Sequence, residues 1–412
     1  MRILNTVVKT TAIFFTILSI IIFASLIYAN ESISDYYCIN EGEILEINSA
    51  VPVRASYCSK ENAKVSYTDV AGSTFTMDVK VLGVIPLKQI NVKVVDEMQV
   101  AVLGTPFGIK LYTEGVLVVG FTEIDTENGD KNPAKTAGIK EGDFIVKING
   151  INVYTNEDVA SIIRSSDGEA VAVELSRNGK KKTVKFTPAK SMSSGVYRAG
   201  IWVKDSSAGI GTMTFYSPTY NTVAGLGHGI CDNETGTLMS LNSGEFVTAS
   251  IASYEKGEVG KAGELNGVFT GKRIADFDLN LENGVYGKVT CDININELVT
   301  VAHRQDVRNA KGYIYTTIDG NNPEYYTCNI KVRGQGEVQN LLIEITDERL
   351  LEATGGIVQG MSGSPVIQNG KLVGAVTHVL VDDPTRGYAI FAENMLETAG
   401  QVADEKALKD AS

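Results

Sequence analysis

The chain has 412 residues, of which 43% are hydrophobic, and this is enough for two or three domains with cores of their own. Its net charge of -12 disfavours nucleic acid as a partner. The five cysteines are odd in number and form no C-x-x-C pair, so neither a disulfide framework nor a zinc site is indicated; they are Cys38, Cys58, Cys231, Cys291 and Cys328.

An uncharged apolar segment follows the basic residues Arg2 and Lys9 and covers residues 10–29. At about 1.5 Å per residue, a helix of this length crosses a hydrocarbon core of about 30 Å. The last three residues of the segment, 27–29, fit a signal-peptidase site poorly. We therefore expect residues 1–30 to be an uncleaved membrane anchor with the bulk of the chain exported.

Residues 31–97 alternate apolar and polar side chains, most clearly in 75–82 and 90–95. This period of two predicts strands that face a core on one side. The pattern indicates a β-rich N-terminal region without indicating its role.

Residues 98–190 resemble a PDZ domain. Residues 137–150 have the small-residue helix, tight turn and strand of that fold, and residues 156–165 predict a helix. The glycine-containing loop at residues 104–111 could cradle a carboxylate with its N–H groups, and the strand after it could accept a peptide by β-augmentation. We therefore expect peptide binding at three residues of this segment, Phe107, Gly108 and Ile109.

Residues 195–412 contain many short strands separated by Gly, Asn and Asp. This spacing predicts a mainly β region, either barrels or a sandwich, and two β-barrels that meet at a cleft fit it. A helix is expected over residues 392–411, where Met395, Leu396 and Ala399 have helical spacing.

Residues 360–365 read Gly-Met-Ser-Gly-Ser-Pro, which predicts the nucleophile loop of a chymotrypsin-like serine peptidase. Glycines at this place allow a turn in which the N–H groups of Gly360 and Ser362 point into one concavity and bind an oxyanion. Met361 replaces the aspartate that trypsin-like enzymes pair with a new N-terminus. We expect its side chain to hold the loop by packing.

The chain has only three histidines. His228 lies in a small-residue segment and precedes Ser362, which is the order of two-barrel peptidases, so it is predicted to be the general base. His303 is expected to be structural. His378 lies on the strand after the nucleophile loop, where it and Thr377 are expected to line the substrate pocket. Cys231 is expected to be an inert small hydrophobe, although a Cys/His nucleophile pair with His228 is conceivable.

The third member of a triad is open on spacing alone. Asp347 ends an apolar strand shortly before Ser362, whereas two-barrel peptidases place this aspartate nearer the histidine. Asp276 and Asp278 fit that position better. Any of the three could instead be a solvated residue at a strand end.

The segments around Asp347 (residues 345–347), Ser362 (354–365) and His378 (374–379) resemble the stage IV sporulation protein B family, PDZ-containing serine peptidases of spore-forming Firmicutes. The likeness extends to the apolar N-terminus, the PDZ region and the His228 motif. It implies a chymotrypsin-like double β-barrel peptidase domain after a PDZ domain and a transmembrane helix. It also implies His228, Asp347 and Ser362 as the catalytic set, without a metal or organic cofactor.

The resemblance further implies a membrane-anchored endopeptidase in the space between forespore and mother cell. Such an enzyme would cleave itself and then a membrane-protein complex that restrains processing of a late sigma factor. Peptide tails are expected to bind at the PDZ groove. The alternative is an inactive PDZ adaptor that only binds membrane-protein tails; the presence of both His228 and the Ser362 loop favours the enzyme.

Overall fold

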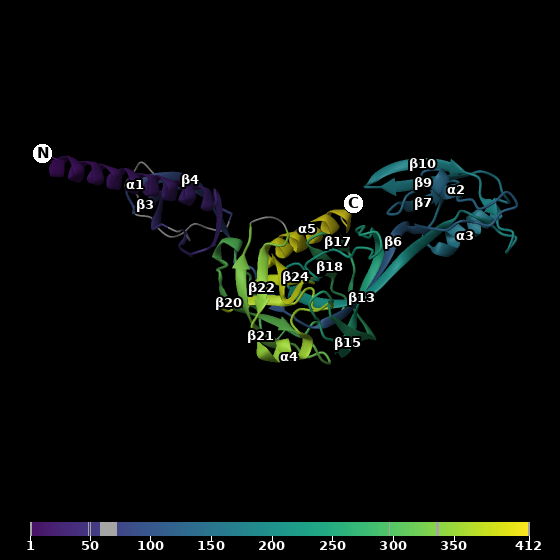
Figure 1. Cartoon of the computed structure of the whole chain (residues 1–412). Helices are drawn as coiled ribbons and strands as arrows, with labels where there is room; N and C mark the ends of the chain where they lie inside the picture. The colour runs from purple at the N-terminus through teal and green to yellow at the C-terminus, as the bar shows by residue number, and fades with distance from the viewer. Residues whose placement is uncertain are drawn as a thin grey trace. The chain divides into compact units, whose positions relative to one another are not determined.

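We analysed a computed structural model of the whole chain, which describes residues 2–47, 49, 51–57, 72–295, 297–334 and 338–410. The chain divides into two compact units, residues 1–98 and 99–412. The fold is mainly β, as predicted, with a closed barrel, open curved sheets, a PDZ domain and an apolar N-terminal helix (Figure 1).

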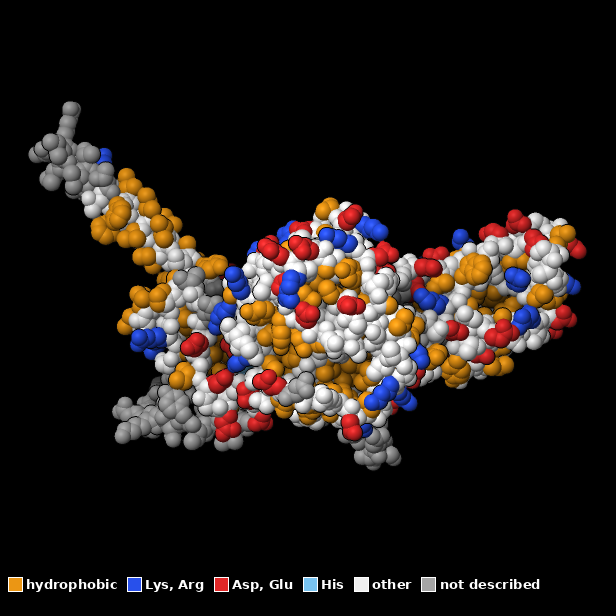
Figure 2. All heavy atoms as spheres, turned by 90° about the horizontal axis from the view of Figure 1, so that it is seen from below, with side chains coloured by type: hydrophobic (Ala, Val, Ile, Leu, Met, Phe, Trp, Pro, Cys, Tyr) orange, Lys and Arg blue, Asp and Glu red, His pale blue; other side chains and the backbone are white. Residues whose placement is uncertain are grey.

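The first unit begins with helix α1 (Arg2–Ser32), whose segment from Thr11 to Glu31 has a mean hydropathy of 2.5. Its large apolar side chains are exposed along the helix, as Figure 2 shows. Such a segment is long and apolar enough for a membrane anchor or a signal sequence.

A four-stranded sheet follows α1 and confirms the strands expected from alternation. Its order is β1-β4-β3-β2, with β1 parallel to β4 and the other pairs antiparallel. Alternate residues in the second half of β4, Ile90, Val92 and Val94, are buried in a small core with Val79 and Tyr37. The strands are β1 (Tyr36–Asn40), β2 (Val53–Tyr57), β3 (Thr74–Val81) and β4 (Ile85–Val95).

The PDZ region of the second unit has a core of its own, which includes Val116, Ile145, Ile163 and Val173. Thr155 and Asp158 form a capping box that begins helix α3, as local sequence favours. The elements are α2 (Pro133–Thr136), β7 (Phe144–Ile148), β8 (Ile151–Asn152), α3 (Asn156–Ser165), β9 (Val171–Arg177), β10 (Lys180–Phe186), β11 (Ala189–Lys190) and β12 (Tyr197–Arg198).

Two long strands, β6 (Pro106–Phe121) and β13 (Ile201–Ser217), connect the PDZ region with the sheets that follow. The C-terminal part of β6 pairs with β7, whereas its N-terminal part, residues 107–113, pairs with β15 (Leu241–Glu255). The same N-terminal part also pairs with residues 206–212 of β13. The PDZ elements therefore lie in the chain between two strands of one larger sheet, and residues 99–113 belong to that sheet rather than to the PDZ core as we had expected.

This larger sheet is open and curved. Its path β6-β13-β14-β18-β17 is extended by β15 and β16 on β6 and by β5 on β13. Phe107, Phe246 and Phe277 pack together in its core, with ring centroids 5.0 Å and 4.8 Å apart in the two contacts. The remaining strands are β5 (Gln99–Val102), β14 (Thr222–Gly225), β15 (Leu241–Glu255), β16 (Glu264–Asp276), β17 (Leu279–Leu281), β18 (Gly284–Lys288) and β19 (Val299–Thr300).

The last strands close into a barrel of order β20-β21-β22-β25-β24-β23. A large apolar cluster fills it and includes Ile314, Ile343, Val376 and Met361, so Met361 packs as expected. The elements are η1 (Arg304–Asp306), β20 (Ala310–Thr316), β21 (Glu324–Val332), β22 (Leu341–Ile345), α4 (Glu348–Thr354), β23 (Pro365–Gln368), β24 (Lys371–Leu380) and β25 (Asp383–Phe391).

Helix α5 (Ala392–Asp410) ends the described chain and confirms the expected C-terminal helix; residue 411 lies outside the described residues. It buries Met395, Leu396 and Ala399, as their spacing predicted. Its first turn also carries Glu393, which binds Nδ1 of His303 at 2.8 Å. The imidazole of His303 thus joins a helix to a loop, in agreement with a structural role.

Candidate active site

The nucleophile loop lies between α4 and β23. Gly360 and Gly363 have φ of +94° and +96°, which side chains other than glycine rarely adopt. The N–H of Gly363 donates to the carbonyl of Val376 at 2.7 Å. A Cβ atom at Gly363 would lie 1.9 Å from the carbonyl oxygen of Thr212, so strand β13 passes directly against the loop.

Two threonines of β13 hold this loop by hydrogen bonds. The N–H of Thr212 donates to the carbonyl of Ser362 and its Oγ1 to the carbonyl of Gly360, both at 2.9 Å. Thr214 Oγ1 donates to the carbonyl of Gly363 at 2.8 Å. The sequence reasoning missed both residues; the only signal was two threonines at alternate positions of a strand, which places them on one face.

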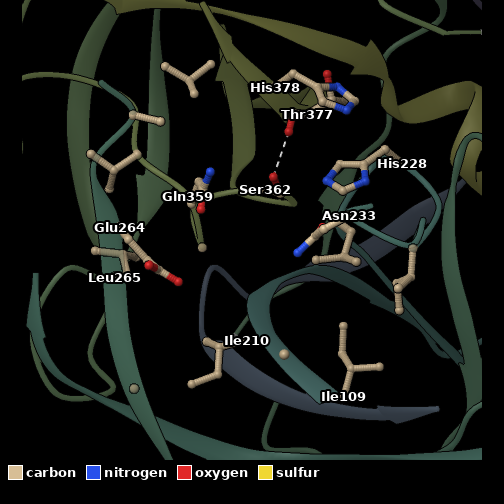
Figure 3. A pocket seen from close by; sticks show the side chains of 18 of the residues that line it. Ile109, Ile210, His228, Asn233, Glu264, Leu265, Gln359, Ser362, Thr377 and His378 are labelled. Carbon is tan, nitrogen blue, oxygen red and sulfur yellow. Dashed lines mark hydrogen bonds between the residues drawn. The ribbon is translucent and has the colours of Figure 1, made fainter. Parts of the chain in front are cut away.

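Ser362 and His228 line one cleft of about 900 Å3 (Figure 3). The ring of His228 lies beside the hydroxyl of Ser362 in this view. The hydroxyl does not bind the ring here, because Ser362 Oγ donates to the carbonyl of Thr377 at 2.6 Å. The structure therefore brings the expected nucleophile and base together with the hydroxyl turned toward a backbone acceptor.

His228 follows β14 in a tight turn, where Leu226 and Gly227 have φ of 62° and 68°. Its Nδ1 lies 2.8 Å from the carbonyl oxygen of Gly229. A carbonyl can only accept, so Nδ1 carries the proton and Nε2 has a free lone pair. A backbone carbonyl thus sets the tautomer that a general base needs.

Asn280 braces the chain just after His228 and was also missed. Its side chain accepts from the N–H of Ile230 at 2.7 Å and donates to the carbonyls of Ile230 and Met239 at 2.9 Å and 2.8 Å. The residue is 8% exposed, so these bonds satisfy a buried amide. A single asparagine within β17 gives no sequence signal of this role.

Thr377 and His378, the expected pocket residues, both line the cleft. The rings of His228 and His378 have centroids 4.5 Å apart. Burial, and then the neighbouring ring of His378, lower the pKa of His228 from 6.5 to about 4. Burial also lowers the pKa of His378. Both rings are therefore neutral at pH 7.

Asp347 does not join His228. It is the N-cap of α4: one carboxylate oxygen accepts from the N–H of Arg349 at 3.1 Å, and the other accepts from the N–H of Thr327 at 3.1 Å. Aspartate is favoured at this position because its side chain satisfies an unpaired N–H of the first helical turn. The geometry therefore does not support the expected role of Asp347 as the orienting acid.

The alternative aspartates are also engaged elsewhere. Asp276 pairs with Arg273, and Asp278 accepts from the N–H of Lys288 at 2.7 Å. Neither is among the described residues that line the cleft. In this structure the partner of the imidazole is the carbonyl of Gly229.

The N–H groups of Gly360 and Ser362, expected to bind an oxyanion, lie in the loop that borders the cleft. Within the described residues, no backbone carbonyl accepts a hydrogen bond from either group. They are available to a ligand. Cys231 also borders the cleft, but burial and then the charge of Glu282 raise the pKa of its thiol, which disfavours a thiolate nucleophile.

The expected PDZ peptide site at Phe107, Gly108 and Ile109 is corrected. These residues lie in the N-terminal half of β6, where Phe107 and Ile109 are buried in the core of the open sheet. A Cβ atom at Gly108 would lie 2.5 Å from the ring of Phe269, which leaves no room for a peptide. The glycine loop resembled a carboxylate cradle, but its alternating apolar residues face a core instead.

A groove of about 310 Å3 lies instead between α3 and the strands β12 and β13. Its wall on α3 is formed by Val159, Ala160 and Ile163, and its wall on β13 by Ile201 and Val203. An apolar groove beside a strand and a helix is the setting in which PDZ domains take peptides.

Comparisons with known proteins agree with both regions. The family model described as SpoIVB peptidase S55 matches residues 195–396, and a PDZ domain model matches residues 129–177. The peptidase match begins at residue 195, although residues 99–112 form strands of the same sheet as the matched segment. The folded region is thus larger than the matched segment.

Among curated proteins, the chain is similar to the zinc metalloprotease RasP of Geobacillus kaustophilus, with 27% identity over 169 residues, 37% of this chain and 40% of the relative. It is also similar to RasP of Shouchella clausii, with 33% identity over 72 residues, 18% of this chain and 16% of the relative. The chain thus spans well under half the length of these relatives.

A solved structure, the PDZ domain of the SdrC-like protein from Listeria monocytogenes, is 18% identical with a TM-score of 0.18. It covers 22% of this chain and 87% of its own.

Proposed function

Because residues 195–396 match the SpoIVB peptidase S55 family of serine peptidases and the chain carries a PDZ domain, we propose that it is an exported, membrane-anchored endopeptidase that uses Ser362 as nucleophile and His228 as general base. The observation that carries this proposal is the convergence of the two residues, distant in sequence, on one cleft. The apolar helix α1 supports attachment to a membrane.

The first step is a change of hydrogen-bond partner at Ser362. Its hydroxyl now donates to the carbonyl of Thr377 at 2.6 Å. Thr377 lines the cleft, so a bound peptide can offer its own N–H group to this carbonyl and thereby free the hydroxyl to turn toward Nε2 of His228. Substrate binding and activation of the nucleophile are coupled in this way.

Chemistry then follows the serine-peptidase sequence. Nε2 of His228 takes the proton of Ser362 Oγ as the oxygen attacks the peptide carbonyl, and the N–H groups of Gly360 and Ser362 hold the oxyanion. His228 gives the proton to the leaving amine, and water then hydrolyses the acyl-enzyme by the same base. Throughout, the carbonyl of Gly229 keeps Nδ1 protonated, which is the orienting role that an aspartate has in other triads.

The resemblance to the sporulation family extends the proposal to a biological substrate. It supports self-cleavage and cleavage of a membrane-protein complex that restrains late sigma-factor processing, between the forespore and mother-cell membranes. The PDZ groove would hold a peptide tail of such a partner while the cleft cuts it.

The test compares full-length wild type with Ser362→Ala and with Ser207→Ala, a serine that lines the same cleft. Expressed in membranes, the wild type and Ser207→Ala should release a shortened chain, and Ser362→Ala should remain intact. The wild type and Ser207→Ala should also cleave an added protein substrate, and Ser362→Ala should not. Cleavage that persists in Ser362→Ala identifies another nucleophile. An intact wild type that still binds membrane-protein tails identifies an adaptor.

A further inference from the structure

One charged side chain lines the catalytic cleft. Among the described residues that border it, Glu264 is the only one that is Asp, Glu, Lys or Arg. Much of the wall around it is apolar and includes Ile210, Leu265 and Val379. A charge in a cleft with low-dielectric walls acts on an approaching ligand more strongly than the same charge on an open surface.

The backbone holds Glu264 next to the nucleophile loop. Glu264 forms a parallel bridge with Gln359, in which the N–H of Leu265 donates to the carbonyl of Gln359 and the N–H of Gln359 donates to that of Gly263, both at 2.8 Å. Gln359 precedes Ser362 by three residues, which span at most about 11 Å. Glu264 is therefore within reach of the residues that flank a bond cleaved by Ser362.

Figure 3 shows the direction of the side chain. The carboxylate of Glu264 points into the cleft from the wall opposite His228. The residue is exposed, and no cation among the described residues pairs with it. The nearby Lys261 pairs with Glu255 at 3.6 Å instead. The cleft thus presents one uncompensated negative charge to its substrate.

We propose that Glu264 is a specificity-determining residue that selects a peptide with Lys or Arg within about two residues of the scissile bond. This inference rests on the proposed peptidase function and adds the substrate class to it. The long aliphatic stem of such a side chain packs on the apolar wall while its cation meets the carboxylate. An acidic residue at the same place of the substrate is repelled, which adds discrimination.

The experiment uses the purified full-length chain in detergent and a positional-scanning library of octapeptides, with Lys, norleucine or Glu at one position at a time. The wild type should cleave the best Lys series about tenfold faster than the norleucine series and should disfavour Glu. Glu264→Gln should remove the preference, and Glu264→Lys should reverse it toward Glu. The Lys preference should also shrink as salt rises.

Glu258→Gln is the matched control, because Glu258 is an exposed carboxylate between β15 and β16 that does not line the cleft, and the pair of Lys261 with Glu255 stays intact in this variant. This variant should keep the Lys preference of the wild type. A preference that is equal in wild type and Glu264→Gln, or absent from a wild type that cleaves the library, overturns the proposal.

A binding measurement separates this failure from failure of the peptidase proposal. Ser362→Ala and Ser362→Ala/Glu264→Gln are compared for binding of a fluorescein-labelled octapeptide with a central Lys and of its norleucine partner. Tighter binding of the Lys peptide that depends on Glu264 supports the specificity role even without turnover. Equal binding of the two peptides to Ser362→Ala contradicts it, whatever the activity of the wild type.

Discussion

The imidazole rings of His228 and His378 lie next to each other on one wall of the cleft, with centroids 4.5 Å apart and planes tilted by 34°. Both lie where burial disfavours the charged form, and a proton on one ring raises the energy of a proton on the other. Glu264 is the charged residue that borders the same cleft, on the opposite wall. The pair keeps the general base ready to accept a proton at pH values at which an ordinary histidine is already charged.

The pH dependence of the reaction should report this pair. The active form of His228 is the neutral one, and its pKa is about 4, so kcat/KM should stay high as pH falls through 6.5 and decline only near pH 4 to 5. His378→Gln removes the second ring and should move the acid limb upward, toward 6.5. Peptide cleavage at saturating and at limiting substrate over pH 4 to 8 measures the acid limb of the wild type and of His378→Gln.

Because the chain has only three histidines, NMR titration of their Cε1–H signals gives an independent readout. His303→Gln identifies the structural histidine and should leave the acid limb of cleavage in place. An acid limb at 6.5 in the wild type, or one that His378→Gln leaves unmoved, contradicts the role of the ring pair.

Asp347 should matter for stability more than for proton transfer. Asn is as good a helix N-cap as Asp, so Asp347→Asn should keep kcat within about threefold, whereas Asp347→Ala should lose about 1 kcal/mol of unfolding free energy. The carboxylate also pairs with Arg349, which is exposed, so that ion pair adds little. Cleavage rates and thermal unfolding of both variants measure the two effects.

The opposite outcome is equally clear for this residue. A loss of kcat of a hundredfold or more in Asp347→Asn, with unchanged unfolding, would show that Asp347 reaches His228 in the reacting enzyme. Asp276→Asn and Asp278→Asn serve as comparisons, since both side chains are engaged away from the cleft.

The parts of the site that could be predicted are those with local chemistry. Residues 360–365 carry glycines and a serine whose spacing is set by the turn itself, and His228 stood out because the chain has so few histidines. Asp347 is different, because its hydrogen-bond partners depend on whether a helix begins directly after it. A strand end followed by a helix makes an aspartate a cap, and no spacing rule distinguishes that from an orienting acid.

The parts that were missed act through the backbone or through register. Thr212 and Asn280 bind carbonyl and N–H groups, which every residue has, so the sequence does not mark their partners. Glu264 meets the nucleophile loop only because β16 is bridged to Gln359. The PDZ site was misplaced because residues 104–111 were judged by their glycines, while the core position of Phe107 decides the fold of that segment.

Thr212 gives a direct test of how the nucleophile loop is held. Thr212→Val keeps the shape but removes the bond from Oγ1 to the carbonyl of Gly360, and one such bond contributes about 1 kcal/mol. Because Gly360 supplies one of the proposed oxyanion donors, kcat should fall about five- to tenfold with little change in KM. Thr212→Ser restores the hydroxyl and should restore kcat. A loss that Ser does not rescue, or an equal change in KM, contradicts this role.

The groove between α3 and β13 should bind peptide tails independently of catalysis. Ala160 and Ser161 are neighbours on α3, but only Ala160 lines the groove. Ala160→Tyr fills the groove and should weaken binding of a tail peptide more than tenfold, while Ser161→Tyr, on the exposed face of the same helix, should bind like the wild type. Fluorescence anisotropy of tail peptides from a C-terminal random library, measured in the Ser362→Ala background, separates binding from cleavage. If both tyrosine variants bind the tail peptide equally, the peptide does not enter this groove. The same conclusion follows if binding is blocked only by substitutions at residues 107–109. With Ser362 intact, Ala160→Tyr and Ser161→Tyr should cleave short octapeptides at equal rates, because such substrates reach Ser362 without a tail bound in the groove.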